Sequence, residues 1–153
     1  MTSRVLSPDA VQAVAWRNGA GATRQLVDDP GGWRLSVADL EVDAAFSDFS
    51  GLDRVFLPLV DVVLSIDGER RAVARGTAVE FRGEAKVAVE LVAGPGRAVN
   101  LMTVRGRCSG GLAAIPRSEW EEQTARSEWD EGQPGVFVDL GEVVVEVRIS
   151  YST

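Results

Sequence analysis

The first group of candidate binding residues lies in a glycine-containing stretch, residues 16–24, which reads Trp-Arg-Asn-Gly-Ala-Gly-Ala-Thr-Arg. Glycines allow positive φ angles and a close approach of the backbone, and the N–H groups of such a turn can face an anion. Asn18, Thr23 and Arg24 are the side chains here that could hold a ligand. The spacing matches neither a P-loop nor a dinucleotide-binding fingerprint. By itself, the stretch favours a plain turn stabilised by Asn18.

A second group lies in residues 46–54, which read Phe-Ser-Asp-Phe-Ser-Gly-Leu-Asp-Arg. Phe46, Asp53 and Arg54 are its candidate binding residues. In one interpretation Asp53 and Arg54 form an exposed ion pair, worth less than about 1 kcal/mol. In the other, Arg54 begins a strand and points into the interior. A buried arginine keeps its charge, so the second interpretation predicts that Arg54 is either paired with an acidic group or binds an anion.

A third group comes from two expected strands. Asn100 and Met102 lie on one face of a strand, because residues two apart in a strand share a face. Arg34 and Ser36 form a similar polar face on the strand 33–40, and we expect both faces to line one cavity. The alternative for Asn100 is a buried amide that bonds to a neighbouring chain segment.

The composition excludes several classes of function. The chain has 153 residues, 16 basic and 23 acidic, a formal net charge of -7, no histidine and one cysteine. Ser-His-Asp and Cys-His mechanisms and histidine-based metal sites are excluded, as are zinc ribbons and iron–sulfur clusters. The acidic balance argues against nucleic acid as a partner. The single Cys108 forms no internal disulfide, so a cytoplasmic setting is expected, and we regard this thiol as incidental. No signal peptide and no apolar run of membrane-spanning length is visible.

The elements that position these residues are predicted to be strands. Short segments with period-2 alternation and glycine punctuation predict an antiparallel barrel or sandwich. The run 55–66, split by Pro58 and Asp61, is either two strands or one broken strand. Asp67-Gly68 predicts a hairpin. The expected strands are 33–40, 62–66, 70–74, 77–82, 86–92, 99–104, 136–140 and 142–151, the last two as a hairpin turning at Gly141.

One segment, 118–129, could form a helix capped by Ser118 with Glu121. Its apolar content is thin and its acidic content is high. A mobile acidic loop is the interpretation we favour.

Taken in order, these motifs resemble those of the HutD/Ves family. The resemblance covers about residues 10–107. The chain departs from the family pattern at four places. Ala20 replaces the middle glycine of the first motif, and residues 44–45 replace the Gly-Pro after Asp43. Ser50 replaces the proline before Gly51, and Ala98 replaces the acidic residue two positions before Asn100. The matching residues are Trp16, Asn18, Gly19, Gly21, Thr23, Arg24, Trp33, Arg34, Ser36, Ala38, Asp43, Phe46, Ser47, Phe49, Gly51, Asp53, Arg54, Phe81, Gly83, Asn100 and Met102.

The resemblance implies an all-β, cupin-like antiparallel barrel, with two small barrel-like halves packed together in a single domain over residues 1–153. The strands in 136–151 would complete the second half. Members are associated with histidine utilisation or, in the Ves branch, with environmental stress, and are thought to bind a small metabolite and restrain the pathway. Ordinary cupins hold a metal with several histidines and a glutamate, which a chain without histidine cannot reproduce.

We therefore expect a non-enzymatic, metal-free binding protein without cofactor. Its ligand would be a carboxylate metabolite of the formylglutamate, glutamate or urocanate class, and a homodimer is left open. The alternatives are a metal-independent isomerase or lyase with Asp53 or a nearby carboxylate as base, and an interaction module that uses the acidic segment 119–131. The expected ligand-binding residues are Asn18, Thr23, Arg24, Arg34, Ser36, Phe46, Asp53, Arg54, Asn100 and Met102.

Overall fold

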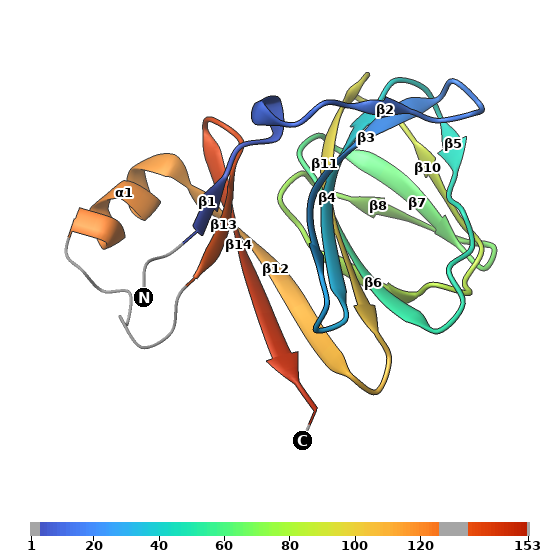
Figure 1. Cartoon of the computed structure of the whole chain (residues 1–153). Coiled ribbons are helices and arrows are strands. Elements are labelled where there is room, and N and C mark those ends of the chain that lie inside the picture. Colours follow the sequence, from blue (N-terminus) through green and yellow to red (C-terminus); the bar gives the residue numbers. More distant parts are fainter. Residues whose placement is uncertain (1–3, 126–134, 153) are drawn as a thin grey trace.

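The structure, a computed structural model, describes residues 4–125 and 135–152, and most of these residues lie in strands (Figure 1). The strands are β1 (Arg4–Leu6), β2 (Val14–Ala15), β3 (Gly21–Asp29), β4 (Trp33–Leu40), β5 (Ala44–Ala45), β6 (Leu52–Pro58), β7 (Val62–Ile66), β8 (Glu69–Val73), β9 (Val79–Arg82), β10 (Val87–Glu90), β11 (Gly96–Val104), β12 (Cys108–Pro116), β13 (Val136–Asp139) and β14 (Val143–Tyr151). A 3-10 turn, η1 (Pro8–Ala10), and one helix, α1 (Arg117–Ala125), complete the described elements.

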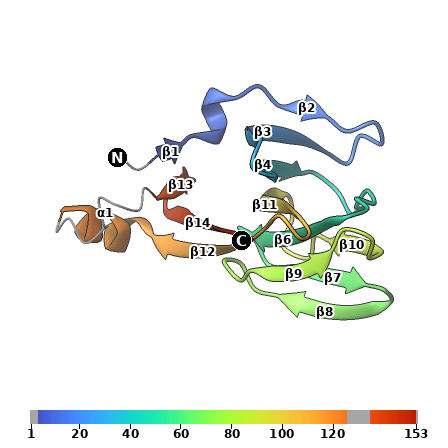
Figure 2. The same ribbon diagram turned by 60° about the horizontal axis from the view of Figure 1, so that its bottom comes forward.

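The strands form three sheets within the described residues. The central sheet has the order β2-β3-β4-β11-β6-β9, and two four-stranded sheets have the orders β5-β10-β7-β8 and β1-β13-β14-β12. Figure 2 shows β7, β8 and β10 on one side of the central strands and β12, β13 and β14 on the other. The all-β fold is confirmed. The sheets stack as in a sandwich and do not close into a single barrel.

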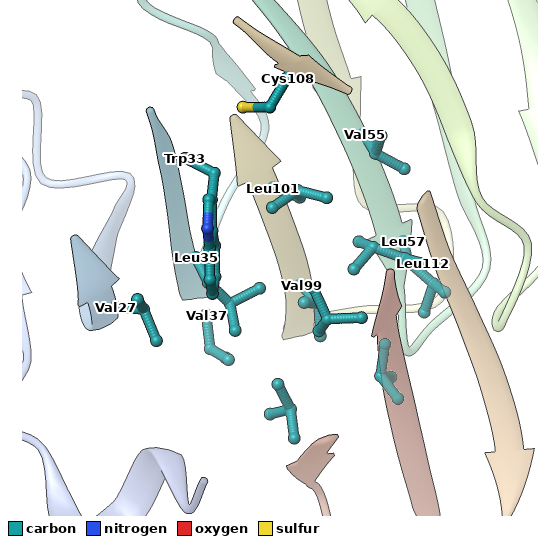
Figure 3. Packing of buried hydrophobic residues seen from close by; sticks show 13 residues of the cluster. Val27, Trp33, Leu35, Val37, Val55, Leu57, Val99, Leu101, Cys108 and Leu112 are labelled. Carbon is teal, nitrogen blue, oxygen red and sulfur yellow. The ribbon is translucent and has the colours of Figure 1, made fainter. Parts of the chain in front are cut away.

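The central sheet is buried on both faces, which explains why its strands contain long apolar runs. Side chains such as Leu35, Leu57 and Val99 point toward β12 and β14 and form one hydrophobic cluster (Figure 3). The alternate side chains, such as Leu40 and Phe56, form a second cluster with the sheet of β7 and β10. Strand pairing carries this alternation across β4, β11 and β6 without a register shift.

The hairpin predicted at Asp67-Gly68 is confirmed. Both residues have positive φ, 49° and 89°, as a two-residue hairpin turn requires, and Ile66 pairs with Glu69. The run 55–66 proves to be two strands, because β6 ends at Pro58 and β7 begins at Val62.

Two parts of the C-terminal third differ from the prediction. Strand β12 was not expected, because two glycines interrupt its apolar pattern. One of them, Gly110, packs so closely that a Cβ there would lie 2.7 Å from Leu101 and 2.8 Å from the Arg148 carbonyl oxygen. The favoured acidic loop was wrong for residues 118–125, which belong to α1 and pack through Trp120 against Phe137 with ring centroids 5.9 Å apart. The rest of the predicted segment, residues 126–129, lies outside the described residues.

No helix in the described part of the chain is long and apolar enough to cross a membrane.

Candidate functional site

A cavity of about 540 Å³ lies over the face of the central sheet that is opposite to β12. Its floor comes from β3, β4, β11 and β6, and its walls come from the turn before β3 and the segment between β5 and β6. The lining residues are Ala15, Trp16, Arg17, Asn18, Thr23, Gln25, Arg34, Ser36, Ala38, Ala45, Phe46, Ser47, Phe49, Arg54, Asn100 and Met102.

Strand register explains why the polar residues of the floor meet. Met102 of β11 pairs with Arg34 of β4 on one side and with Arg54 of β6 on the other. In the next row of the same face, Asn100 pairs with Ser36. The predicted convergence of these residues on one cavity is therefore present in the structure.

Arg54 is the most unusual residue of this floor. Its side chain is buried, with a residue exposure of 6%, and burial lowers its pKa to about 10. Its guanidinium carbon lies 5.2 Å from the ring centroids of Phe46 and Phe81 and 5.3 Å from that of Phe49. The interpretation of Arg54 as an inward-pointing residue is confirmed.

The polar contacts of Arg54 are few. One terminal nitrogen donates to the Ser47 carbonyl oxygen over 3.4 Å, while Nε has no partner. Within residues 4–125 and 135–152 no carboxylate pairs with it. A buried cation without a counter-ion is costly unless an anion occupies the adjoining space.

Asn100 supplies an unused acceptor beside this cation. The residue is 8% exposed, and its Oδ1 atom has no hydrogen-bond partner in the described protein. Buried polar atoms are nearly always bonded, so an orphan acceptor at the edge of a cavity indicates a site for a ligand or water donor. Arg54 and Asn100 thus present one donor group and one acceptor that the protein itself does not use.

The charges that line the cavity all have one sign. Arg17, Arg34 and Arg54 contribute three cations, and no aspartate or glutamate is among the lining residues. Arg17 and Arg34 are exposed, and neither forms an ion pair with another described residue. This concentration of positive charge is unexpected in a chain with a net charge of -7. The cavity therefore favours an anion.

The glycine-containing stretch forms a turn that borders the cavity. Asn18 accepts a 2.9 Å hydrogen bond from the Ala20 amide, and Gly19 has a φ of +72°. Trp16 donates through Nε1 to the Thr23 hydroxyl over 2.7 Å. The turn interpretation is confirmed, and Asn18 and Thr23 still line the cavity.

Two predicted site residues do not reach the cavity. Arg24 donates to Asp39 over 2.9 Å and to the Val11 carbonyl oxygen over 3.0 Å, so it binds the N-terminal segment to the sheet. Asp53 accepts a 3.0 Å hydrogen bond from Arg105, and the predicted ion pair between Asp53 and Arg54 is absent from the described contacts. Neighbouring residues in a strand point to opposite faces, so Arg54 and Asp53 cannot both face the cavity.

Several lining residues were not among the predicted site residues. Gln25 pairs with Ser36 across β3 and β4 and extends the polar floor. Trp16, Arg17 and Phe49 border the cavity and lie within the first two motifs, so proximity to those motifs was the available signal.

The cavity does not fit the metal site of ordinary cupins. The chain contains no histidine, and the lining residues include no carboxylate and no thiol. Among the residues that the structure describes, no group of three or more acidic or cysteine side chains could hold a metal ion. The side chains that line the cavity are suited to an anion and not to a metal cation.

Comparison with known proteins places the chain in one family. Residues 9–151 match the family model described as HutD. A protein of 21.2 kDa from the hutC 3′ region of Pseudomonas putida is 33% identical over 72% of this chain and 60% of its own length. The protein Ves of Citrobacter koseri is 30% identical over 67% of this chain and 59% of its own length. The chain thus spans about three fifths of these curated relatives.

Solved structures with similar folds include a HutD protein and a cupin. HutD from Pseudomonas fluorescens SBW25, in a structure described as a formate condition, has a TM-score of 0.67 and 32% identity, covering 72% of this chain and 65% of that one. An RmlC-like cupin from Shewanella frigidimarina, 8% identical, has a TM-score of 0.53 and covers 64% of this chain and 87% of its own. The cupin-like fold is confirmed.

Proposed function

The chain belongs to the HutD family, and we propose on that premise that its cavity binds a small carboxylate-bearing metabolite. We infer further that this binding regulates histidine utilisation or a related amino-acid catabolic pathway in the cytoplasm, without a metal and without catalysis. The names of two relatives, a protein of the hutC region and HutD itself, support the pathway.

The single observation that carries the proposal is the unpaired, buried Arg54 beside the orphan acceptor of Asn100. A guanidinium can bind a carboxylate through two parallel hydrogen bonds, and such charge-assisted contacts contribute about 1.5–3 kcal/mol. A volume of about 540 Å³ lies within the range of small-molecule pockets. Phe46 and Met102 supply apolar wall next to the polar floor.

The charge of the lining also narrows the ligand class. A free α-ammonium group needs a carboxylate or several neutral acceptors, and the three arginines of the cavity would repel it. An N-acylated amino acid such as formylglutamate, or a dicarboxylate, carries the negative charge without the ammonium. We therefore expect formylglutamate to bind more tightly than glutamate.

Binding without turnover fits the side chains present. General acid–base catalysis needs a group whose pKa lies near the working pH. The titratable groups of the lining are the three arginines, and Asp53, the base of the enzymatic alternative, faces away from the cavity toward Arg105. The cavity supports recognition of an anion better than proton transfer.

Calorimetric titration tests the proposal. Wild-type protein is titrated with formylglutamate, glutamate, urocanate, formate and glutarate, the last of which keeps both carboxylates of glutamate but lacks its ammonium. Formylglutamate and glutarate should bind more tightly than glutamate, and Arg54→Ala should abolish binding. Arg70→Ala removes an arginine of the exposed hairpin β7–β8 and serves as the matched control. Absence of binding by the wild type, or equal binding by Arg54→Ala, would overturn the proposal.

A further inference from the structure

The wall that covers Arg54 is a short segment held from outside the cavity. Residues 46–51, here called the strap, connect β5 to β6 and place Phe46, Ser47 and Phe49 on the cavity. Phe46 and Phe49 also lie against the Arg54 guanidinium, and the Ser47 carbonyl oxygen accepts its hydrogen bond. The position of the strap therefore determines both the shape of the cavity and the burial of its cation.

The C-terminal end of the strap is held by two charged residues that do not line the cavity, Glu84 and Arg105. The Glu84 carboxylate accepts a 2.9 Å hydrogen bond from the Gly51 amide. Arg105 donates to both oxygens of that carboxylate, over 3.0 and 2.8 Å. The Arg105 amide donates to the Gly51 carbonyl oxygen over 3.0 Å, so the peptide groups on both sides of Gly51 are fixed.

The same arginine holds the first residues of β6. Its guanidinium donates to the Leu52 carbonyl oxygen and to Asp53, each over 3.0 Å. The hydrogen bonds from Arg105 and from the Gly51 amide lower the pKa of Glu84 well below its usual range. This carboxylate is therefore ionised throughout the neutral range, and the contact does not depend on physiological pH.

We infer that Glu84 and Arg105 act as a clamp, a pair of positioning residues that sets the ligand affinity of the cavity through the strap without touching the ligand. The expected effect on ligand affinity rests on the proposed function. The effect of the clamp on the position of the strap does not. Without the clamp, the Phe46 amide keeps its bond to the Val87 carbonyl oxygen and the Phe49 amide its bond to the Gly83 carbonyl oxygen. The turn at Gly51 would lose its anchor, the strap would move more freely about these two bonds, and Arg54 would lose part of its enclosure. A ligand would then have to order the strap when it binds, at a cost in affinity.

The structure offers a matched control for this clamp. Arg70 and Glu90 form a two-contact salt bridge of 3.2 and 2.8 Å between β8 and β10, and neither residue lines the cavity. Removing this bridge changes the surface charge in the same way as removing the clamp. It leaves the strap with all its hydrogen bonds.

The experiment compares Glu84→Ala, Glu84→Gln and Glu90→Ala in the full chain. Hydrogen exchange of the strap amides is measured without ligand, and formylglutamate affinity by calorimetry. Glu84→Ala should accelerate exchange at Gly51 and weaken binding by about tenfold, which corresponds to about 1.4 kcal/mol. Glu84→Gln keeps an acceptor for the Gly51 amide and should recover part of both effects. Glu90→Ala should match the wild type in both measurements.

The two measurements separate the possible failures. Unchanged strap exchange in Glu84→Ala would overturn the clamp. Faster exchange with unchanged affinity would overturn its role in binding and leave the proposed function intact. If the wild type binds none of the titrated compounds, the proposed function fails, and the exchange measurement alone decides whether Glu84 positions the strap.

Discussion

Arg34 and Arg54 lie on the two sides of Met102 in one row of the central sheet. Two strand spacings separate their Cα atoms, about 10 Å in all. Arg34 is exposed, whereas Arg54 is buried among three phenylalanine rings. The two cations therefore meet different environments. Arg34 remains hydrated and screened by salt. Arg54 lies in surroundings of lower polarity, where its electrostatic attraction to an anion is stronger.

Arg54→Met should stabilise the protein while it abolishes binding. The wild-type residue buries a cation without a carboxylate partner, and methionine fills a similar volume without that desolvation cost. We expect the free energy of unfolding to rise by about 1–3 kcal/mol. Denaturant titration without ligand measures the change. A lower stability in the variant would mean that the contacts of Arg54 with the rings outweigh its desolvation.

Anion binding should depend on pH only at the alkaline end. Because burial lowers the pKa of Arg54 to about 10, its charge is complete at pH 7–9 and is lost above pH 10. Affinity for glutarate should be constant from pH 7 to 9 and fall about tenfold for each further unit above 10. Calorimetry over this range, with circular dichroism to confirm that the fold persists, provides the measurement. A decline that begins below pH 9 would assign the binding to another group.

The lowered pKa of Arg54 also determines how the free energy of unfolding changes with pH. Below pH 10 Arg54 is charged in both the folded and the unfolded state, so the cost of burying the cation is fully present. As the pH rises through 10 the folded state loses this proton first, while the unfolded arginine, whose pKa is higher because it is not buried, keeps it. The contribution of Arg54 to the free energy of unfolding should therefore increase with pH in this window. The difference between the wild type and Arg54→Met should shrink there.

Gly83→Ala should disturb the strap from beneath. A Cβ at this position would lie 2.0 Å from the Phe49 carbonyl oxygen and 2.9 Å from that of Leu52. The strap would have to move, and we expect a loss of about 2–4 kcal/mol in the free energy of unfolding and weaker binding of formylglutamate. Gly111→Ala is the control, because a Cβ there meets no atom within 4 Å. Equal stability of the two variants would contradict the close packing of Gly83 against Phe49.

Arg24→Ala should lower the stability of the protein and leave ligand binding nearly unchanged. The variant loses the contacts with Asp39 and with the carbonyl oxygens of Pro8 and Val11. We expect stability to fall by about 1–2 kcal/mol and formylglutamate affinity to stay within about twofold of the wild type. Thermal unfolding and calorimetry on the same samples test both parts. A tenfold loss of affinity would show that Arg24 contributes to ligand binding after all.

The polar floor could be predicted because strand alternation is local. Arg34 with Ser36, and Asn100 with Met102, each lie two residues apart, so each pair shares a face wherever its strand is placed. The same rule already excludes a site that contains both Asp53 and Arg54. Which member of that pair faces inward depends on how β6 pairs with β11 and β9, and this information comes from distant parts of the chain.

Other parts of the fold could not be predicted because they depend on tertiary contacts. Strand β12 forms by pairing with β14 along its whole length, from Cys108 with Tyr151 to Pro116 with Val143. The two glycines of β12 interrupt the alternation of apolar residues that would have predicted it. Helix α1 has no buried residue, and its apolar contact is made by Trp120 with Phe137, a residue of β13. The clamp of Glu84 and Arg105 joins residues 21 positions apart and gave no signal in the motifs.

The burial of β11 on both faces limits how the length of this strand can change. Inserting one residue before Asn100 would turn Asn100 and Met102 toward the hydrophobic cluster and Leu101 toward the cavity. The floor of the cavity and one wall of the core would be lost together. Length changes that preserve the fold must therefore fall in the connecting loops, and any variation of the ligand site within β11 must come from substitutions.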